Sequence, residues 1–174
     1  VESHLDDIIK GADMLAGCVA AGGKVLLFGN GGSAADAQHL AAEFVNRFQI
    51  ERPPLAAIAL TTDTSILTSI ANDYRFDDIF SKQIKALGKK GDIAWGLSTC
   101  GNSANVVKAV KSARKLGMST IGMTGRGGEL AKYADLAFSV PSDTAARVQE
   151  THITLGHILC ELIERKLYPD EFND

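Results

Sequence analysis

The sequence feature that most constrains the fold is a short apolar run that ends in a glycine-rich turn and continues into an alanine-rich helix. Residues 25–28 read as a buried strand, the turn is Gly29-Asn30-Gly31-Gly32-Ser33, and the helix carries His39 and Glu43 on one face. Glycine lets the backbone approach a ligand closely, and the unpaired N–H groups at a helix N-terminus favour an anion. We therefore predict a phosphate-binding turn, with Ser33 as the N-cap of the helix.

Two other interpretations of this turn stay open. Residues 29–34 also fit a dinucleotide-binding fingerprint, which needs an acidic residue roughly 20 positions later, at the end of the next strand. The next predicted strand, over residues 56–60, comes late and ends in Thr61-Thr62-Asp63. The turn can also serve the fold alone, without a ligand.

A second loop of the same kind follows the strand that we predict over residues 92–97. It reads Ser98-Thr99-Cys100-Gly101-Asn102-Ser103, and a helix predicted over residues 104–116 begins directly after it. Hydroxyl groups in front of a helix N-terminus are typical of a phosphate cradle, although an ordinary capped turn has the same composition. Open α/β sheets bind ligands at the carboxyl ends of their strands, so the two loops support one another.

Strands alternate with helices along the whole chain. The predicted strands cover residues 25–28, 56–60, 92–97, 118–123 and 135–140. The predicted helices cover residues 1–21, 34–48, 66–71, 77–87, 104–116, 130–133 and 144–167. This order is typical of an α/β protein with a doubly wound, flavodoxin-like parallel sheet of five strands flanked by helices. We expect a single domain over residues 1–174, in which the first and last helices flank a core over residues 24–140.

Composition limits the classes of protein that fit. The 174 residues, of which 45% are hydrophobic and 22% charged, are enough for one domain with a full core. The net charge of −3 gives no excess of positive charge for a nucleic-acid backbone, and no signal peptide or transmembrane-length run appears. Cys18, Cys100 and Cys160 are far apart and lack metal-site spacing, which favours a reducing cytoplasm over a disulfide-linked framework. We expect a cytoplasmic protein with no nucleic-acid or membrane partner.

Several motifs together resemble one family. They are residues 29–33, Gln38-His39 with Glu43, Thr62-Asp63-Thr64-Ser65, Asn72-Asp73, residues 98–103, and Arg147-Val148-Gln149-Glu150 followed by His157. With these motifs the chain resembles the sugar isomerase (SIS) domain family and, within it, the phosphoheptose isomerases, over nearly its full length. The resemblance implies conversion of the ketose D-sedoheptulose 7-phosphate to the aldose D-glycero-D-manno-heptose 7-phosphate, the first step toward the heptose of lipopolysaccharide.

The resemblance also implies a role for each matched residue. Isomerisation between C1 and C2 passes through an enediol, which needs a base at the carbon and an acid at the oxygens. Glu43 matches the family's base and His157 its acid, and no lysine Schiff base is required. The matched substrate-binding residues are Asn30, Gly31, Gly32, Ser33, Glu43, Asn72, Asp73, Ser98, Thr99, Cys100, Ser103 and Gln149.

A divalent ion, usually zinc (Zn2+) and one per subunit, is implied at His39, Glu43, Gln149 and His157. Mixed nitrogen and oxygen ligation suits zinc. Gln149 and His157, however, are separated by about 12 Å along an ideal helix, and an ion on Glu43 and His157 would compete with their use as base and acid. The resemblance also implies a homo-oligomer, a tetramer, with sites completed at subunit interfaces.

The chain departs from the family pattern at two positions. Cys100 stands where the family usually has serine, and a thiol is a weaker hydrogen-bond donor than a hydroxyl. Ala146 stands where some members have an acidic residue before the arginine. His152 has no matched role, and we expect it to be an ordinary core histidine.

Two alternative functions come from other classes of protein. A non-catalytic SIS-domain regulator binds a bacterial replication-initiator protein and resembles this chain in its Asn-Gly and Gln-His stretches. That relative lacks the paired glutamate and histidine, which this chain has as Glu43 and His157. A sugar-phosphate-sensing module would need the two loops and no base.

Overall fold

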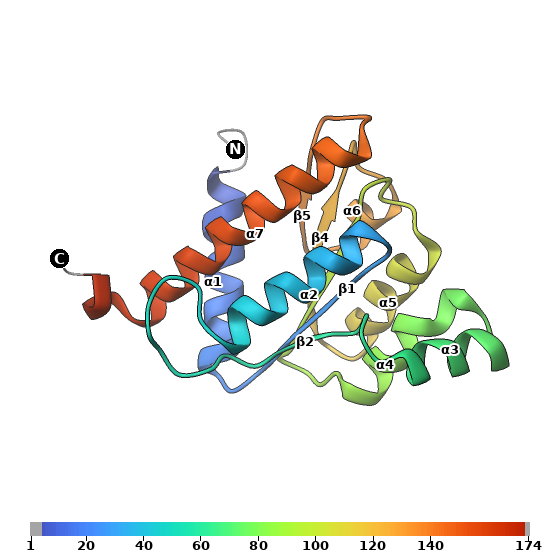
Figure 1. Cartoon of the computed structure of the whole chain (residues 1–174), viewed down its shortest axis with the longest axis horizontal. Helices are drawn as coiled ribbons and strands as arrows, with labels where there is room; N and C mark the ends of the chain where they lie inside the picture. Colours follow the sequence, from blue (N-terminus) through green and yellow to red (C-terminus); the bar gives the residue numbers. More distant parts are fainter. Residues whose placement is uncertain (1–4, 173–174) are drawn as a thin grey trace.

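The computed structural model describes residues 5–172 and shows a five-stranded, all-parallel sheet with helices on both faces (Figure 1). The strands lie in the order β2-β1-β3-β4-β5. They are β1 (Val25–Gly29), β2 (Ala57–Ala59), β3 (Ile93–Ser98), β4 (Ser119–Thr124) and β5 (Leu136–Ser139). The chain runs from β1 out to β2 and crosses back to β3, so the strand order reverses between β1 and β3, where such sheets bind ligands. The predicted doubly wound α/β fold is confirmed.

Helices cover the sheet in two layers. One face carries α1, α2 and α7, and the other carries α4, α5 and α6, with α3 packed against α4 (Figure 1). Their bounds are α1 (Leu5–Ala20), α2 (Gly32–Val45), α3 (Thr64–Asp73), α4 (Ile79–Leu87), α5 (Ala104–Lys115), α6 (Glu129–Tyr133) and α7 (Ala145–Leu167), with short 3-10 helices η2 (Phe76–Asp78) and η3 (Pro169–Phe172). Residues 1–4 of the predicted first helix lie outside the described residues. Within residues 5–172, no helix is both long and apolar enough to cross a lipid bilayer.

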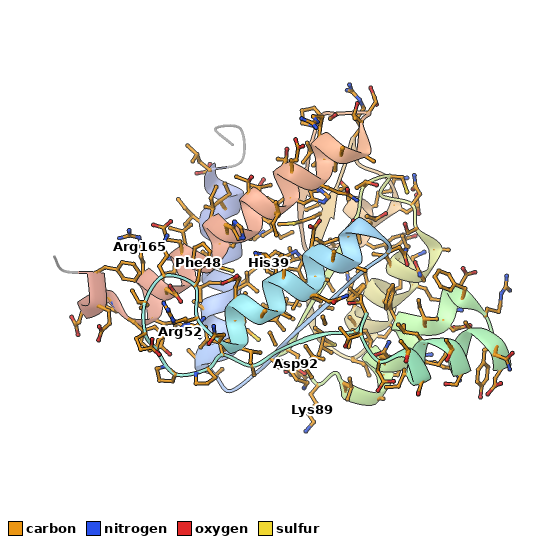
Figure 2. The ribbon with its side chains drawn as sticks, in the orientation of Figure 1. His39, Phe48, Arg52, Lys89, Asp92 and Arg165 are labelled. Carbon is orange, nitrogen blue, oxygen red and sulfur yellow. The ribbon has the colours of Figure 1, made fainter. Side chains whose placement is uncertain are left out.

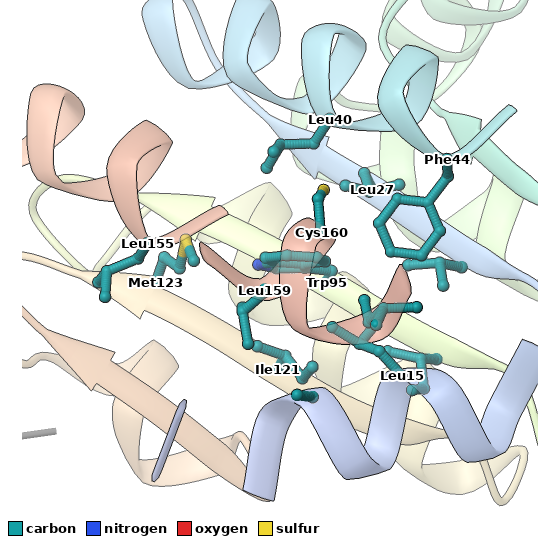
Figure 3. Close-up of a cluster of buried hydrophobic side chains, with 14 of the residues drawn as sticks. Leu15, Leu27, Leu40, Phe44, Trp95, Ile121, Met123, Leu155, Leu159 and Cys160 are labelled. Atoms are coloured by element: carbon teal, nitrogen blue, oxygen red, sulfur yellow. The ribbon is translucent and has the colours of Figure 1, made fainter. Parts of the chain in front are cut away.

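Each face of the sheet has its own hydrophobic core. In β1, Val25 and Leu27 pack with α1, α2 and α7, whereas Leu26 and Phe28 pack with α4 and α5. Side chains of a strand alternate between faces, and burial on both faces explains why β1 reads as an unbroken apolar run. The fully buried Trp95 of β3 lies beneath α7 in the first of these cores (Figure 3).

One predicted detail of the first turn is wrong. The N-cap of α2 is Gly31, which has φ +55° and makes no side-chain cap hydrogen bond. Ser33 is instead buried inside the first turn of the helix. Glycine accepts a positive φ, so the chain reverses at Gly31 and the helix begins earlier than the Ser33 side chain alone suggests.

The helix α3 is longer than predicted at both ends, and Asp63 caps its start. The Asp63 carboxylate accepts a hydrogen bond of 2.9 Å from the backbone N–H of Ile66. The helix continues through Asn72 and Asp73, which the sequence pattern places beyond its end. The strand β2 is shorter than predicted and forms one edge of the sheet.

Candidate active site

The two predicted loops meet where the strand order reverses. Asn30 follows β1, and Asn105 lies in the first turn of α5, behind the loop that follows β3. Their side-chain amides exchange two hydrogen bonds, of 2.9 and 2.8 Å. The glycine-rich turn and the hydroxyl-rich loop are thus positioned as one unit.

The loop over residues 98–103 gathers its hydroxyl and thiol groups in front of α5. The Oγ atoms of Ser98 and Ser103 are 2.9 Å apart, and Cys100 Sγ lies 3.6 Å from the first and 3.9 Å from the second. Ser103 is the N-cap residue of α5 and makes no side-chain cap hydrogen bond. The backbone N–H of Asn102 donates to Cys100 Sγ and, more than any other contact, lowers the pKa of this thiol. These donors suit an anion at the start of the helix.

A cavity of about 390 Å³ opens beside this loop. Its walls come from the loops after β3, β4 and β5 and from the start of α7. The lining residues are Thr99, Cys100, Asn102, Arg126, Gly127, Gly128, Ser142, Asp143, Ala145 and Val148. Its volume is within the usual range for a small-molecule site.

The predicted acid and base lie on two neighbouring helices, α2 and α7, which run side by side in the same direction (Figure 2). Gly32 lies against the side-chain amide of Gln149, and about two turns further along both helices His39 lies against His157. The Nε2 atoms of the two imidazoles are 2.8 Å apart, and Glu43 Oε1 lies 3.5 Å from His39 Nε2. The side chains of His39 and Glu43 are 47% and 21% exposed, so the group faces solvent in the isolated chain.

These three side chains form a donor set that zinc accepts. A tetrahedral ion about 2.0–2.1 Å from each imidazole nitrogen needs those nitrogens about 3.3 Å apart, a little more than the 2.8 Å observed. Within residues 5–172, no group of three or more His, Cys, Asp or Glu already stands as a metal cluster. The chemistry of His39, Glu43 and His157 fits an ion once the two rings separate slightly. Gln149 of the same chain lies against Gly32 and does not reach them.

The two parts of the predicted site lie far apart within one chain. The loop over residues 98–103, the predicted phosphate loop, is joined to the turn before Gly32 through the contact of Asn105 with Asn30. Glu43, in contrast, is near the opposite end of α2. From Gly32 to Glu43 the helix advances about 16 Å, at about 1.5 Å per residue. The structure thus brings together the loops in one place and His39, Glu43 and His157 in another.

Sequence reasoning missed a buried ion pair that fixes the end of α2. The Glu164 carboxylate on α7 accepts hydrogen bonds of 2.9 Å from Arg52 Nε and from the backbone N–H of Phe48. Arg52 also donates to the carbonyl oxygens of Phe44 and Glu43, at 2.8 and 2.7 Å. Burial tends to raise the pKa of Glu164, but the hydrogen bonds that its carboxylate accepts from the backbone N–H groups of residues 48–50 and from Arg52 outweigh it and hold the pKa below its usual value. No sequence motif marks this pair, because its members are 112 residues apart.

Three other residues singled out in the sequence belong to neither group. Asn72 and Asp73 are exposed in the last turn of α3, where the amide of Asn72 donates to the carboxylate of Asp73 at 2.9 Å, and neither lines the cavity. Their predicted contact with substrate therefore depends on atoms outside this cavity. His152 is fully buried in the core, as expected, with Nε2 3.1 Å from the carbonyl oxygen of Thr124, although its Nδ1 has no hydrogen-bond partner among the described residues.

Comparison with known proteins agrees with these features. A profile of the SIS domain matches residues 1–125. The phosphoheptose isomerase of Nitratidesulfovibrio vulgaris is 60% identical over 166 residues, which are 95% of this chain and 80% of that protein. The solved phosphoheptose isomerases of Neisseria gonorrhoeae and Francisella tularensis are 48% and 42% identical, with TM-scores of 0.87 and 0.89, over 92% of this chain and 86% of each of theirs. Similarity of this extent, in a chain with both loops and with the glutamate and histidine, shows that the protein belongs to the SIS domain family and, within it, to the phosphoheptose isomerases.

Proposed function

We propose that this protein isomerises D-sedoheptulose 7-phosphate to D-glycero-D-manno-heptose 7-phosphate in the cytoplasm, as the first step toward the heptose of lipopolysaccharide. The observation that carries the proposal is the grouping of Glu43, His39 and His157 on two neighbouring helices. A phosphate-binding module that performs no chemistry has no need of a carboxylate and an imidazole at this point. Family membership points to the same reaction.

Glu43 and His157 suffice for the proton transfers. Glu43 removes a proton from C1 of the ketose while His157 gives a proton to the C2 oxygen, which produces the enediol. The protonated Glu43 then returns its proton to C2, the C1 hydroxyl gives its proton back to His157, and C1 becomes the aldehyde. Both residues end in their starting protonation states, so the isomerisation consumes no other reactant.

The remaining predicted residues would hold the substrate. In this proposal Ser98, Thr99, Cys100 and Ser103 bind the phosphate with the backbone N–H groups at the start of α5. The sugar is lined by Asn30, Gly31, Gly32 and Ser33, with Asn72, Asp73 and Gln149 contacting its hydroxyls.

Zinc is part of the proposal, one ion per subunit. His39, Glu43 and His157 would hold it, and Gln149 stays a predicted fourth ligand. A bound zinc ion would supply Lewis-acid polarisation of the substrate oxygens. An ion on Glu43 and His157 competes with their use as base and acid, so in this proposal the two side chains move the protons when they are free of the ion, and the ion supports the site between turnovers.

A shared site in a homotetramer is the arrangement that we propose. An extended chain advances about 3.5 Å per three bonds, so the roughly eight bonds from C1 to phosphorus span about 9 Å. This is shorter than the distance of about 16 Å along α2 that separates Gly32 from Glu43. A phosphate held by one subunit would therefore meet the glutamate of another. Val45 and Ile58, which are 47% and 41% exposed, offer apolar surface for such a contact.

The deciding experiment is turnover of sedoheptulose 7-phosphate by purified protein, with and without a chelator, beside Glu43→Gln. We expect wild-type turnover, loss of about a thousandfold or more in kcat for the variant because its base is gone, and retained binding of inorganic phosphate. The chelator arm reports whether an ion takes part. Light scattering at micromolar concentration should show a tetramer, and a monomer would contradict the shared site.

Absence of turnover from folded, oligomeric, zinc-supplemented protein would overturn the isomerase proposal. Retained phosphate binding would then indicate a sugar-phosphate sensor. The non-catalytic regulator would be tested by direct binding to a replication-initiator protein.

A further inference from the structure

The cavity beside the phosphate loop is lined by one positively charged side chain, to which none of the sequence motifs assigns a role. Among the residues that line it, Arg126 carries the positive charge and Asp143 the negative charge. The other predicted phosphate ligands are neutral hydroxyl, thiol and N–H groups. A sugar phosphate is close to dianionic at neutral pH, and a guanidinium is the side chain that best matches its oxygens.

The segment that carries Arg126 is fixed to the phosphate loop. The backbone N–H groups of Gly125 and Leu130 donate to the carbonyl oxygens of Thr99 and Gly101, at 3.0 and 2.9 Å. The N–H of Glu129 donates to Asn102 Oδ1 at 3.0 Å. Arg126 is therefore held at one wall of the cavity, with the loop over residues 98–103 forming another.

Arg126 is engaged by a carboxylate when no anion is present. Its Nε donates to Asp143 Oδ1 at 2.6 Å, and the two side chains are 61% and 78% exposed. This hydrogen bond is the main cause that lowers the pKa of Asp143, so the carboxylate stays ionised at neutral pH. Exposed ion pairs contribute little to stability, so a phosphate with more charge can replace Asp143 at small cost.

We propose that Arg126 binds the phosphate group of the sugar phosphate, and that Asp143 competes with that phosphate for the guanidinium. This assignment rests on the proposed function for the identity of the ligand. Arg126 then contributes charge and specificity for phosphate esters, and Asp143 positions it at the cavity while the site is empty.

The proposal and a purely structural ion pair predict different changes in phosphate affinity for two substitutions. If the pair only joins two loops, removing either partner has the same effect on phosphate binding. If Arg126 binds phosphate and Asp143 competes, removal of the arginine weakens binding whereas removal of the aspartate strengthens it.

The test is the affinity of the full chain for inorganic phosphate, measured by calorimetry at low salt. We expect Arg126→Gln to weaken binding about tenfold or more, the usual effect of losing a charge-assisted hydrogen bond. Arg126→Lys should recover part of the loss, because it restores the charge without the fork of donors. Asp143→Asn should tighten binding about two- to fivefold, the scale of an exposed ion pair.

Arg165→Gln is the matched control, since it removes an exposed pair with Glu161 on α7. It should leave phosphate affinity unchanged. The proposal would be overturned if the phosphate affinity of Arg126→Gln were within twofold of wild type, or if Asp143→Asn weakened phosphate binding. Because Arg126 and Asp143 are exposed, the variants should melt like wild type, and a melting curve checks this.

Kinetics separates this inference from the proposed function. With sedoheptulose 7-phosphate as substrate, Arg126→Gln should raise KM and leave kcat close to wild type, because it removes binding that ground state and transition state share. If wild-type protein does not turn over the substrate, but Arg126→Gln still weakens and Asp143→Asn still tightens phosphate binding, the isomerase proposal fails and the arginine assignment stands. If wild-type protein turns over and the affinities do not change, only the arginine assignment fails.

Discussion

The ring of Phe48 lies 5.3 Å from the imidazole of His157, inclined to it by 30°. Phe48 belongs to the segment after α2, and its backbone N–H donates to the buried carboxylate of Glu164. The same carboxylate is paired with Arg52, which also holds the carbonyl oxygen of Glu43. A single buried ion pair thus fixes the backbone of the predicted base and of Phe48, whose ring lies against the predicted acid.

Glu164→Gln should make the protein less stable at neutral pH and less sensitive to acid. Loss of one partner leaves a buried, uncompensated charge on Arg52, which costs about 3–5 kcal/mol. The pKa of Glu164 is lower in the folded protein than its usual 4.5. Unfolded chains therefore bind the proton first as the pH falls, and wild type loses this stabilisation from pH 4.5 downward.

Urea unfolding at neutral pH and at steps below pH 4.5 measures this dependence. Between neutral and acidic pH, the free energy of unfolding should fall less for Glu164→Gln than for wild type. Glu161→Gln is the control, because Glu161 lies on the same helix in an exposed pair with Arg165 and should keep the wild-type slope. Equal slopes for wild type and Glu164→Gln would contradict the role of this carboxylate.

Glu164 and Glu161 also show why part of the site cannot be predicted from sequence. Both are glutamates near the end of α7, yet one is buried and bonded to Arg52, and the other is a surface residue. The choice depends on where the segment after α2 runs, and helix periodicity carries no information about that. The separation of Glu43 from the loops is likewise a property of how α2 lies on the sheet.

The strands and the two loops were predictable because their signals are local. Burial on both faces makes β1 a continuous apolar run, and glycine or hydroxyl residues follow β1 and β3 directly. Ser33 is a favourable N-cap residue by side-chain preference, but the positive φ of Gly31 starts the helix before it.

Asn105→Ala should weaken phosphate binding while leaving the protein folded. The substitution removes both hydrogen bonds to Asn30 and the acceptor for the N–H of Val106. We expect a loss of about 1–3 kcal/mol in the free energy of unfolding and of about tenfold in phosphate affinity, since a buried polar partner is left unpaired. Ser112→Ala, which removes a hydroxyl bonded to Lys108 further along α5, should leave the affinity unchanged. Wild-type affinity in Asn105→Ala would show that the two loops do not depend on each other.

Gly101→Ala should be strongly destabilising. Gly101 has φ +69°, and a Cβ there would overlap the carbonyl oxygen of Gly127. Both the strained φ and a clash with backbone oppose the substitution, so we expect a loss of about 2 kcal/mol or more in the free energy of unfolding.

Gly17→Ala in α1 is the opposite case, because its Cβ meets nothing within 4 Å, and it should stabilise by about 0.5–1 kcal/mol. Thermal melts of both variants beside wild type give the comparison, and a neutral Gly101→Ala would mean that the loop rearranges freely.

Cys100 should be the cysteine that iodoacetamide alkylates first, and phosphate should slow the reaction. Its pKa is lowered chiefly by the N–H of Asn102, and the residue is exposed beside the cavity. Burial raises the pKa of Cys18 to about 11 and that of Cys160 to about 12, so neither supplies much thiolate at neutral pH.

Mass spectrometry of the alkylated peptides, with and without inorganic phosphate, measures the rates of alkylation. Cys100→Ser is the control that should lose the fast-reacting site. A serine hydroxyl is also the better donor, so this variant should bind phosphate at least as tightly as wild type. Alkylation of Cys100 that phosphate leaves unchanged would place the anion away from the loop over residues 98–103, and the assignment of that loop as the phosphate site would then be wrong.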